Sequence, residues 1–330
     1  MIMAGDIGAT KTILALFNKE TGPGKTIAEA VFPSGDYPGL EEIASEFLSH
    51  AAHGIPTAAC FGVAGPVVNG QANITNLSWN VSVTRLRSIL GIPHISLIND
   101  VQAVGYSIGS LDATDLKTIN EGRPVKGGAK AIIAPGTGLG EAILLWDGRG
   151  YRCYPTEGSH ADFAPADEQQ VGLLRHVGRK FGHVSWERVC SGIGISNLYD
   201  YLKATGDYEE PDWLKEKLAV AIDPVPEIFR GAMEADPPAE VCRTTVKMFV
   251  SILGAEAGNL ALKTLATGGI YIGGGIAPRV LDLIIDGTFM ESFTNKGRLA
   301  GLLRDIPVRI VMNPRAALMG AAVVGLGMEG

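Results

Sequence analysis

The chain has 330 residues, enough for two domains with large cores, and its 46% hydrophobic and 19% charged residues exclude a disordered protein. Its net charge of −7, without any basic block, argues against nucleic acid as a partner. The N-terminus lacks a secretory signal and no apolar stretch reaches transmembrane length, so we expect a soluble cytoplasmic protein with no membrane partner.

The four cysteines are far apart and form no C-x-x-C pair, which makes a disulfide framework or a zinc site improbable. Reduced, buried thiols fit this spacing best. They are Cys60, Cys153, Cys190 and Cys242.

Two apolar runs, Met1–Asp6 and Thr12–Phe17, predict strands joined by a tight glycine-containing turn. Such a turn directs backbone N–H groups and a threonine hydroxyl to one spot, which suits phosphate. Asp6 could hold a metal through water or position the phosphate; the alternative is a plain hairpin turn. The candidate nucleotide-binding residues here are Gly5, Asp6, Ile7, Gly8, Ala9 and Thr10.

A helix over Leu40–His53 and a buried strand over Ala58–Val63 follow. The segment Asn76-Leu77-Ser78-Trp79 is either a loop that lines a sugar pocket or a turn with a packed tryptophan. A short helix, Val83–Leu90, precedes the next buried strand, His94–Ile98. This alternation predicts an α/β domain.

The strand at 94–98 ends on Asn99 and Asp100, and a helix begins directly afterwards. Open α/β sheets bind ligands at this end of their strands. We therefore interpret Asp100 as a general base. The alternative is that Asp100 only caps the helix, which aspartate favours, and the two roles are compatible.

The strand–turn–strand pattern of residues 1–17 recurs about 130 residues later. It consists of a strand at Ala129–Ala134, a turn at Pro135–Gly140 and an apolar run at Ala142–Trp146. We interpret this as a weak internal repeat. Two phosphate-type turns imply a nucleotide held between two related domains. A Rossmann domain is disfavoured, because neither turn has the pattern G-x-G-x-x-G before a helix.

The second half carries insertions. We expect a loop at Glu157–Pro165, which concentrates a carboxylate and an imidazole, and a helix that ends at Gly192 as its C-cap. The triple glycine Gly273-Gly274-Gly275 lets the backbone lie against a planar group such as adenine and ribose, or it is only a crowded turn. The other predicted elements are helices at Asp167–Phe181, Ile195–Lys203, Trp213–Leu218, Pro238–Leu265 and Pro314–Gly325, and strands at Gly269–Ile272 and Val308–Met312.

Five motifs in order carry a family resemblance that covers nearly the whole chain. The sequence resembles the bacterial glucokinases, the hexokinase-like members of the actin/Hsp70/sugar-kinase superfamily. The motifs, joined by Glu187 in the segment 185–189, are Gly5–Thr10, Leu97–Asp100, Pro135–Gly140, Glu157–Pro165 and Gly273–Arg279.

The resemblance implies two RNase H-like domains around a deep cleft: a smaller one of 1–110 with 314–330, and a larger one of 111–313 with helical insertions. It implies ATP-dependent phosphorylation of glucose with Asp100 as base, Mg²⁺ carried with the nucleotide, and a homodimer. Glucose would bind Asn99, Asp100, Glu157, His160 and Glu187. ATP would bind the 5–10 turn, the triple glycine at Gly274, and Gly136, Thr137 and Gly138.

Two departures from related families matter. Ala9 stands where the commonest form of the family has a second glycine. No cysteine cluster follows His160, which sets the chain apart from the zinc-containing repressor and kinase group. Two alternatives stay open: a kinase for another hexose or amino sugar, and a nucleotide-dependent sensor of the same superfamily. The donor could also be ADP or polyphosphate.

Overall fold

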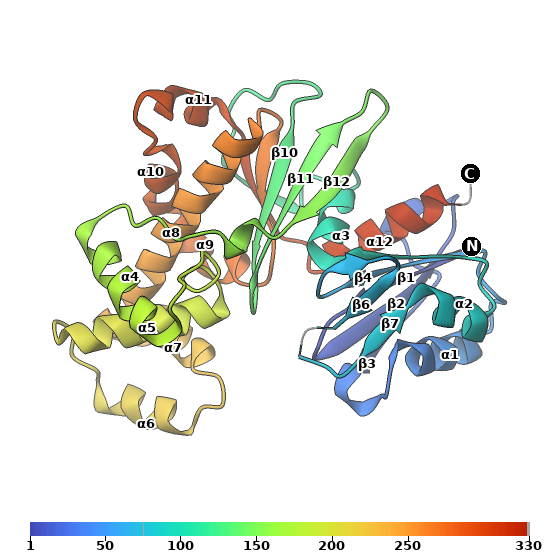
Figure 1. Ribbon diagram of the computed structural model, residues 1–330, viewed down its shortest axis with the longest axis horizontal. Coiled ribbons are helices and arrows are strands. Elements are labelled where there is room, and N and C mark those ends of the chain that lie inside the picture. The colour runs from blue at the N-terminus through green and yellow to red at the C-terminus, as the bar shows by residue number, and fades with distance from the viewer. Residues whose placement is uncertain (75, 329–330) are drawn as a thin grey trace. The chain divides into compact units, whose positions relative to one another are not determined.

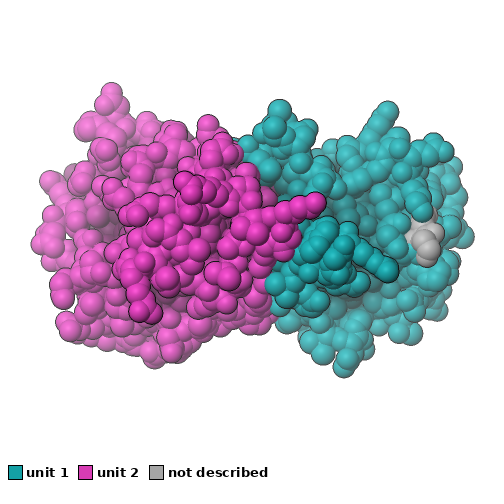
Figure 2. Space-filling view, turned by 90° about the horizontal axis from the view of Figure 1, so that it is seen from above, with its two compact units in different colours: residues 1–116, 144–155, 312–330 teal, residues 117–143, 156–311 magenta. Residues whose placement is uncertain are grey.

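The computed structural model describes residues 1–74 and 76–328. The chain divides into two compact units, shown in two colours in Figure 2: residues 1–116, 144–155 and 312–330, and residues 117–143 and 156–311. Each unit is described by itself below. The domain boundaries given above, 1–110 with 314–330 and 111–313, stay a prediction.

A five-stranded sheet organises the first unit, in the order β3-β2-β1-β4-β8. Strands β1 to β3 form an antiparallel meander, and β4 and β8 continue the sheet parallel to β1. The first strand pair confirms the predicted hairpin, whereas the edge strand β3 was not predicted. The strands are β1 (Ile2–Ile7), β2 (Lys11–Phe17), β3 (Ala28–Pro33), β4 (Ala58–Val63) and β8 (His94–Asn99).

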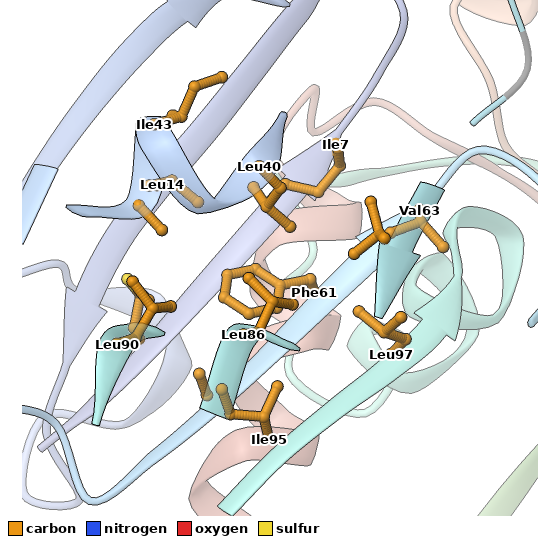
Figure 3. Close-up of a cluster of buried hydrophobic side chains, with 14 of the residues drawn as sticks. Ile7, Leu14, Leu40, Ile43, Phe61, Val63, Leu86, Leu90, Ile95 and Leu97 are labelled. Atoms are coloured by element: carbon orange, nitrogen blue, oxygen red, sulfur yellow. The ribbon is translucent and has the colours of Figure 1, made fainter. Parts of the chain in front are cut away.

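Side chains of these strands alternate between two buried faces, as the two-residue period of a strand requires. In β4, Phe61 and Val63 enter one core, and Cys60 enters the other. Figure 3 shows the first core, where Phe61 lies among side chains from the helices and from β8. Because both faces are buried, the central strands read as continuous apolar runs in the sequence.

Helices cover both faces of this sheet. The first core includes side chains of α1 and α2, and the second includes side chains of α3 and α12, which lie side by side (Figure 1). The 3₁₀ turns of the unit are η1 (Gly22–Gly24) and η2 (Ser34–Asp36). The helices are α1 (Leu40–Ala51), α2 (Val83–Leu90), α3 (Asp100–Ser107) and α12 (Ala316–Gly327).

A small antiparallel sheet of β5 (Val67–Val68), β6 (Gln71–Asn73) and β7 (Asn80–Ser82) precedes α2. Trp79 lies at its edge, buried in the first core, and its Nε1 donates to the carbonyl oxygen of Tyr37 at 3.0 Å. The packed-turn interpretation of this tryptophan is therefore confirmed.

The second large sheet repeats the order of the first: β12-β11-β10-β13-β14 corresponds strand for strand to β3-β2-β1-β4-β8, and β9 is added at its edge. The internal repeat seen in the sequence is thus a repeat of topology. Strands β9 and β12 were not predicted. The six strands are β9 (Leu116–Asn120), β10 (Lys130–Pro135), β11 (Leu139–Trp146), β12 (Tyr151–Thr156), β13 (Gly269–Ile272) and β14 (Val308–Val311).

The helical insertions of the second unit surround α8, whose 25 residues make it the longest helix of the described chain. The sequence did not predict α7, α10 or α11. The elements are η3 (Gly158–His160), α4 (Glu168–Phe181), α5 (Gly192–Thr205), α6 (Asp212–Val220), α7 (Val225–Met233), α8 (Glu240–Thr264), η4 (Ala277–Val280), α9 (Leu281–Ile285), α10 (Thr288–Thr294), η5 (Gly297–Leu299) and α11 (Ala300–Asp305).

One predicted element is wrong. No helix ends at Gly192; instead α5 begins there, with Ser191 as its N-cap and the Ser191 Oγ accepting from the amide of Gly194 at 3.1 Å. Glycine is common at both kinds of helix end, and the serine before it was the stronger signal.

All four cysteines are free and buried, as predicted. Burial raises the pKa of the Cys60 and Cys153 thiols to about 12. In the part of the chain that the structure describes, no helix combines the length and the apolar character that a membrane span needs.

Candidate active site

The first unit places two carboxylates at neighbouring strand ends. Asp6 lies near the end of β1, and Asp100 is the first residue of α3. Gly62 in β4 makes their proximity possible: a Cβ atom there would lie 3.0 Å from the Cβ of Ala103 and 3.9 Å from the Cα of Asp100. The absence of a side chain at position 62 lets α3 pack closely on the sheet.

The environment of Asp6 raises its pKa to about 6. Burial is the largest cause, the nearby carboxylate of Asp100 adds to it, and Lys11 opposes it. A pair of interacting carboxylates beside a phosphate-type turn is a site that favours a cation.

Asn99 and Asp100 have different roles at the start of α3. The Oδ1 atom of Asn99 accepts from the amides of Val101 at 2.9 Å and Gln102 at 3.2 Å, so Asn99 is the N-cap. Asp100 Oδ1 accepts from the Val101 amide at 2.8 Å. The alternative that Asp100 itself is the cap is therefore wrong, because the helix begins at Asp100, one residue earlier than that alternative requires.

The 5–10 turn divides into core and surface residues. Gly5 and Ile7 are strand residues whose positions face the first core; a Cβ at Gly5 would lie 2.7 Å from Leu14 and Phe61 side-chain atoms. Gly8 donates its amide to the carbonyl of Lys11 at 3.0 Å and accepts at its own carbonyl from Ser34 Oγ at 2.7 Å. Gly8 and Ala9 are half-buried, and Thr10 is exposed.

In the second unit, the loop that follows β12 runs beside the segment before α5. The amide of Trp186 donates to the carbonyl oxygen of Ala161 at 3.1 Å, and the amide of Glu187 donates to the carbonyl oxygen of Ser159 at 3.0 Å. These bonds bring Glu187 to the loop of Glu157 and His160, about 30 residues earlier in the chain.

Three predicted sugar-binding residues therefore share one hydrogen-bonded frame. Glu157 and His160 are exposed, and His160 Nε2 lies 3.7 Å from Glu157 Oε2 across η3. Glu187 is half-buried, and its Oε2 accepts from the amide of Leu139 at 3.0 Å. Glu187 thus joins the sugar-type loop to the second phosphate-type turn.

Glycines make the second turn compact. A Cβ at Gly138 would lie 2.5 Å from Glu187 Oε2, and the carbonyl of Gly136 accepts from the amide of Gly192 at 2.8 Å. Gly192 is the first residue of α5, so the N-terminus of a 14-residue helix faces the turn. Helix N-termini attract phosphate through free N–H groups and the helix dipole.

Gly274 links the triple glycine to the same turn. Its φ of +79° lies in the left-handed region, and a Cβ there would overlap the carbonyl oxygen of Pro135. The amide of Ile276 also donates to that carbonyl at 3.4 Å. Only glycine fits this position, so the two turns stay in contact.

A cavity of about 370 Å³ opens at these turns, entirely within the second unit. Helices α5 and α7 and the segment after the triple glycine supply its walls. The sequence did not indicate most of these residues, because it predicted the end of a helix at Gly192 where α5 begins, and because it did not predict α7. The lining residues are Gly136, Thr137, Gly192, Ile193, Ser196, Asp223, Val225, Phe229, Gly275, Ile276 and Arg279.

Comparisons with known proteins find similar chains over nearly the whole length of this one. Residues 3–327 match the family model described as Glucokinase. A glucokinase of Nostoc punctiforme is 43% identical and one of Trichormus variabilis 42%, each over 98% of both chains. A crystal structure of glucokinase from an Antarctic psychrotroph matches 99% of this chain and 98% of its own, with 30% identity and a TM-score of 0.81. The predicted fold class, two RNase H-like α/β domains with helical insertions in the second, is confirmed.

Proposed function

Because this chain belongs to the glucokinase family, we propose that it transfers the γ-phosphoryl group of ATP to the 6-hydroxyl group of D-glucose. One observation carries the proposal. Glu187 shares a frame with Glu157 and His160 and accepts from the amide of Leu139 in the phosphate-type turn. These hydrogen bonds fix the position of groups that suit a sugar relative to groups that suit phosphates.

Sugar recognition requires donors and acceptors on neighbouring hydroxyl groups. Glu157 and Glu187 are acceptors, and His160 and Asn99 both donate and accept. A site built from such groups rejects an analogue that lacks a hydroxyl, because its own polar atoms then stay unpaired.

Asp100 is the proposed general base. Its carboxylate accepts the proton of the 6-hydroxyl group while the hydroxyl oxygen forms a bond to the γ-phosphorus, and the bond from that phosphorus to the departing ADP oxygen breaks. The charge interaction of Asp100 with Asp6, which lies at the phosphate-type turn of the first unit, supports this role.

The cavity beside α5 supports a nucleotide as the phosphoryl donor. Its volume of about 370 Å³ and its mixed apolar and polar lining suit a base and ribose, which polyphosphate lacks. The turns at 5–10 and 136–138 are the proposed phosphate contacts, and Gly274 in the triple glycine is the proposed contact of the adenine and ribose.

The carboxylate of Asp6 fits a magnesium ion that arrives with the nucleotide. Mg²⁺ prefers oxygen ligands and takes few of them from protein when phosphates supply the rest. Among the described residues, no three or more His, Cys, Asp or Glu side chains are grouped so that they could hold a metal ion. Bound Mg²⁺ would neutralise charge on the transferred phosphoryl group.

We further propose a homodimer that works in the cytoplasm. Four buried thiols fit a reducing compartment. Light scattering of the purified chain measures its mass directly: a value twice 34.7 kDa is expected, and a value equal to it would contradict the dimer.

A coupled assay across sugars and donors tests the proposed function. We expect ATP with glucose to give the highest kcat/KM among glucose, mannose, fructose and N-acetylglucosamine, each with ATP, ADP or polyphosphate. Preference for another sugar would assign a different hexose kinase. ATPase activity that glucose does not stimulate would favour the sensor.

Replacing Glu157 with glutamine tests the sugar site alone. Loss of the carboxylate removes charged hydrogen bonds to the sugar, each contributing about 1.5–3 kcal/mol, so the KM for glucose should rise about tenfold or more. The KM for ATP should not change. Glu216→Gln, on the exposed face of α6, is the matched control. Equal glucose KM values in the two variants would remove Glu157 from the site.

A further inference from the structure

Two buried carboxyl groups lie close together in the second unit, and the phosphoryl-transfer scheme uses neither. Glu141 stands in β11, 3% exposed, and Glu256 stands in α8, 0% exposed. Burial raises the pKa of both, and the charge of Glu256 raises that of Glu141 further, to about 7.

The two carboxyl groups differ in their hydrogen bonds. Glu256 accepts from Asn259 Nδ2 at 2.8 Å and from Lys263 Nζ at 3.3 Å. Glu141 Oε1, by contrast, has no hydrogen-bond partner among the described residues. An ionised carboxylate in that position is strongly disfavoured, so of the two Glu141 is the group that holds a proton.

Glu141 lies directly beneath the sugar-type loop. A Cβ atom at Gly158 would overlap Glu141 Oε2, so a side chain at position 158 would have to displace this carboxyl group. Thr156 Oγ1 accepts from the amide of Gly158 at 3.2 Å and donates to the carbonyl of Glu141 at 3.4 Å. The loop that carries Glu157 and His160 therefore packs against Glu141, at its carboxyl group through Gly158 and at its backbone carbonyl through Thr156.

We propose that Glu141 is a positioning residue: its neutral carboxyl group supports Gly158 and fixes the loop of Glu157 and His160, and its ionisation displaces this loop and weakens sugar binding. The second half of this statement rests on the proposed function. The first half concerns the loop alone.

The charges around Glu141 set the direction of the effect. Glu256 opposes ionisation of Glu141 and Lys263 favours it. Lys296 lies behind Glu256, with its Nζ on Asn259 Oδ1 at 2.7 Å, and the buried thiol of Cys190 stays neutral because burial and both glutamates raise its pKa. Glu141 is therefore neutral below pH 7 and ionised above it, so sugar affinity should fall as the pH rises.

Glu141→Gln keeps the shape of the side chain and removes its titration. In the unaltered chain, the KM for glucose should rise about fivefold or more between pH 6 and pH 8.5, the size of a typical coupling between two sites. In Glu141→Gln it should stay within about twofold over that range, while the KM for ATP follows the same curve in both proteins. Other titratable groups are common to both proteins, so their effects cancel in the comparison.

Amide NMR of Gly158 supplies a readout that needs no sugar. We expect an inflection of its resonance near pH 7 in the unaltered chain and none in Glu141→Gln. In Glu256→Gln the inflection should move to lower pH, because a charge that opposes ionisation is gone. This variant also serves if Glu141→Gln does not fold.

Each outcome decides a part of the proposal. A Gly158 resonance with the same pH dependence in all three proteins would show that Glu141 does not hold the loop. A shifted resonance with identical pH profiles of the glucose KM would overturn the link to sugar binding. An unaltered chain that phosphorylates no glucose would refute the proposed function, and the NMR comparison would still decide whether Glu141 supports the loop.

Discussion

Replacing Asp100 with asparagine should lower the kcat for glucose phosphorylation by about 10²–10⁴-fold, the usual contribution of a general base. Asparagine keeps the size of the side chain and an oxygen that can accept from the Val101 amide, as Asp100 Oδ1 does at 2.8 Å. It cannot take a proton from the sugar hydroxyl. The KM values should change little, because the lost interaction belongs to the transition state.

A second effect of the same variant reports on geometry. The charge of Asp100 helps to raise the pKa of Asp6, so the pKa of Asp6 should fall below about 6 in Asp100→Asn. Asp212→Asn is the matched control, because Asp212 is likewise the first residue of a helix, α6, and lies on the surface. A kcat for Asp100→Asn within a few-fold of this control would end the assignment of Asp100 as the base.

Replacing Gly320 with alanine should destabilise the first unit by about 1–3 kcal/mol, the usual cost of inserting a methyl group into a filled core. A Cβ atom at Gly320 would overlap the carbonyl oxygen of Ala103 and would lie 3.1 Å from the amide nitrogen of Ser107, both in α3. Helix α12 would have to move away from α3, the helix that begins at Asp100, so activity should fall as well.

Gly327→Ala is the matched control for this prediction. It lies in the same helix, and a Cβ atom there would meet nothing within 4 Å. Urea unfolding followed by tryptophan fluorescence measures the difference, since Trp79 is buried in the first unit. Equal midpoints for the two variants would show that α12 and α3 do not depend on close contact at Gly320.

The sequence was informative where one physical rule dominates. Strand β4 was predicted at its exact bounds, because both of its faces are buried and its sequence is a continuous apolar run. Helix α2 was predicted as well, from its short amphipathic pattern. The repeat of the glycine turns anticipated the repeated strand order.

The elements that were not predicted have sequences in which no single physical rule dominates. In the edge strand β3 exposed and less exposed positions alternate, but the residue types do not follow them, since the apolar Val31 is exposed. The pairing of β3 with β2 depends on tertiary context that a local pattern does not carry. The sequence predicted the end of a helix at Gly192 where a helix begins, so the residues of α5 that line the cavity were not predicted. The buried pair of Glu141 and Glu256 joins residues 115 positions apart, and only the fold brings them together.

Identification of the product tests the central proposal most directly. The purified chain is incubated with equimolar ATP and ¹³C-labelled glucose, and phosphorus and carbon NMR follow the reaction. We expect one ADP for each phosphorylated sugar, with the phosphoryl group on the oxygen of carbon 6. ATP hydrolysis at the same rate with and without glucose, and no phosphorylated sugar, would contradict the account.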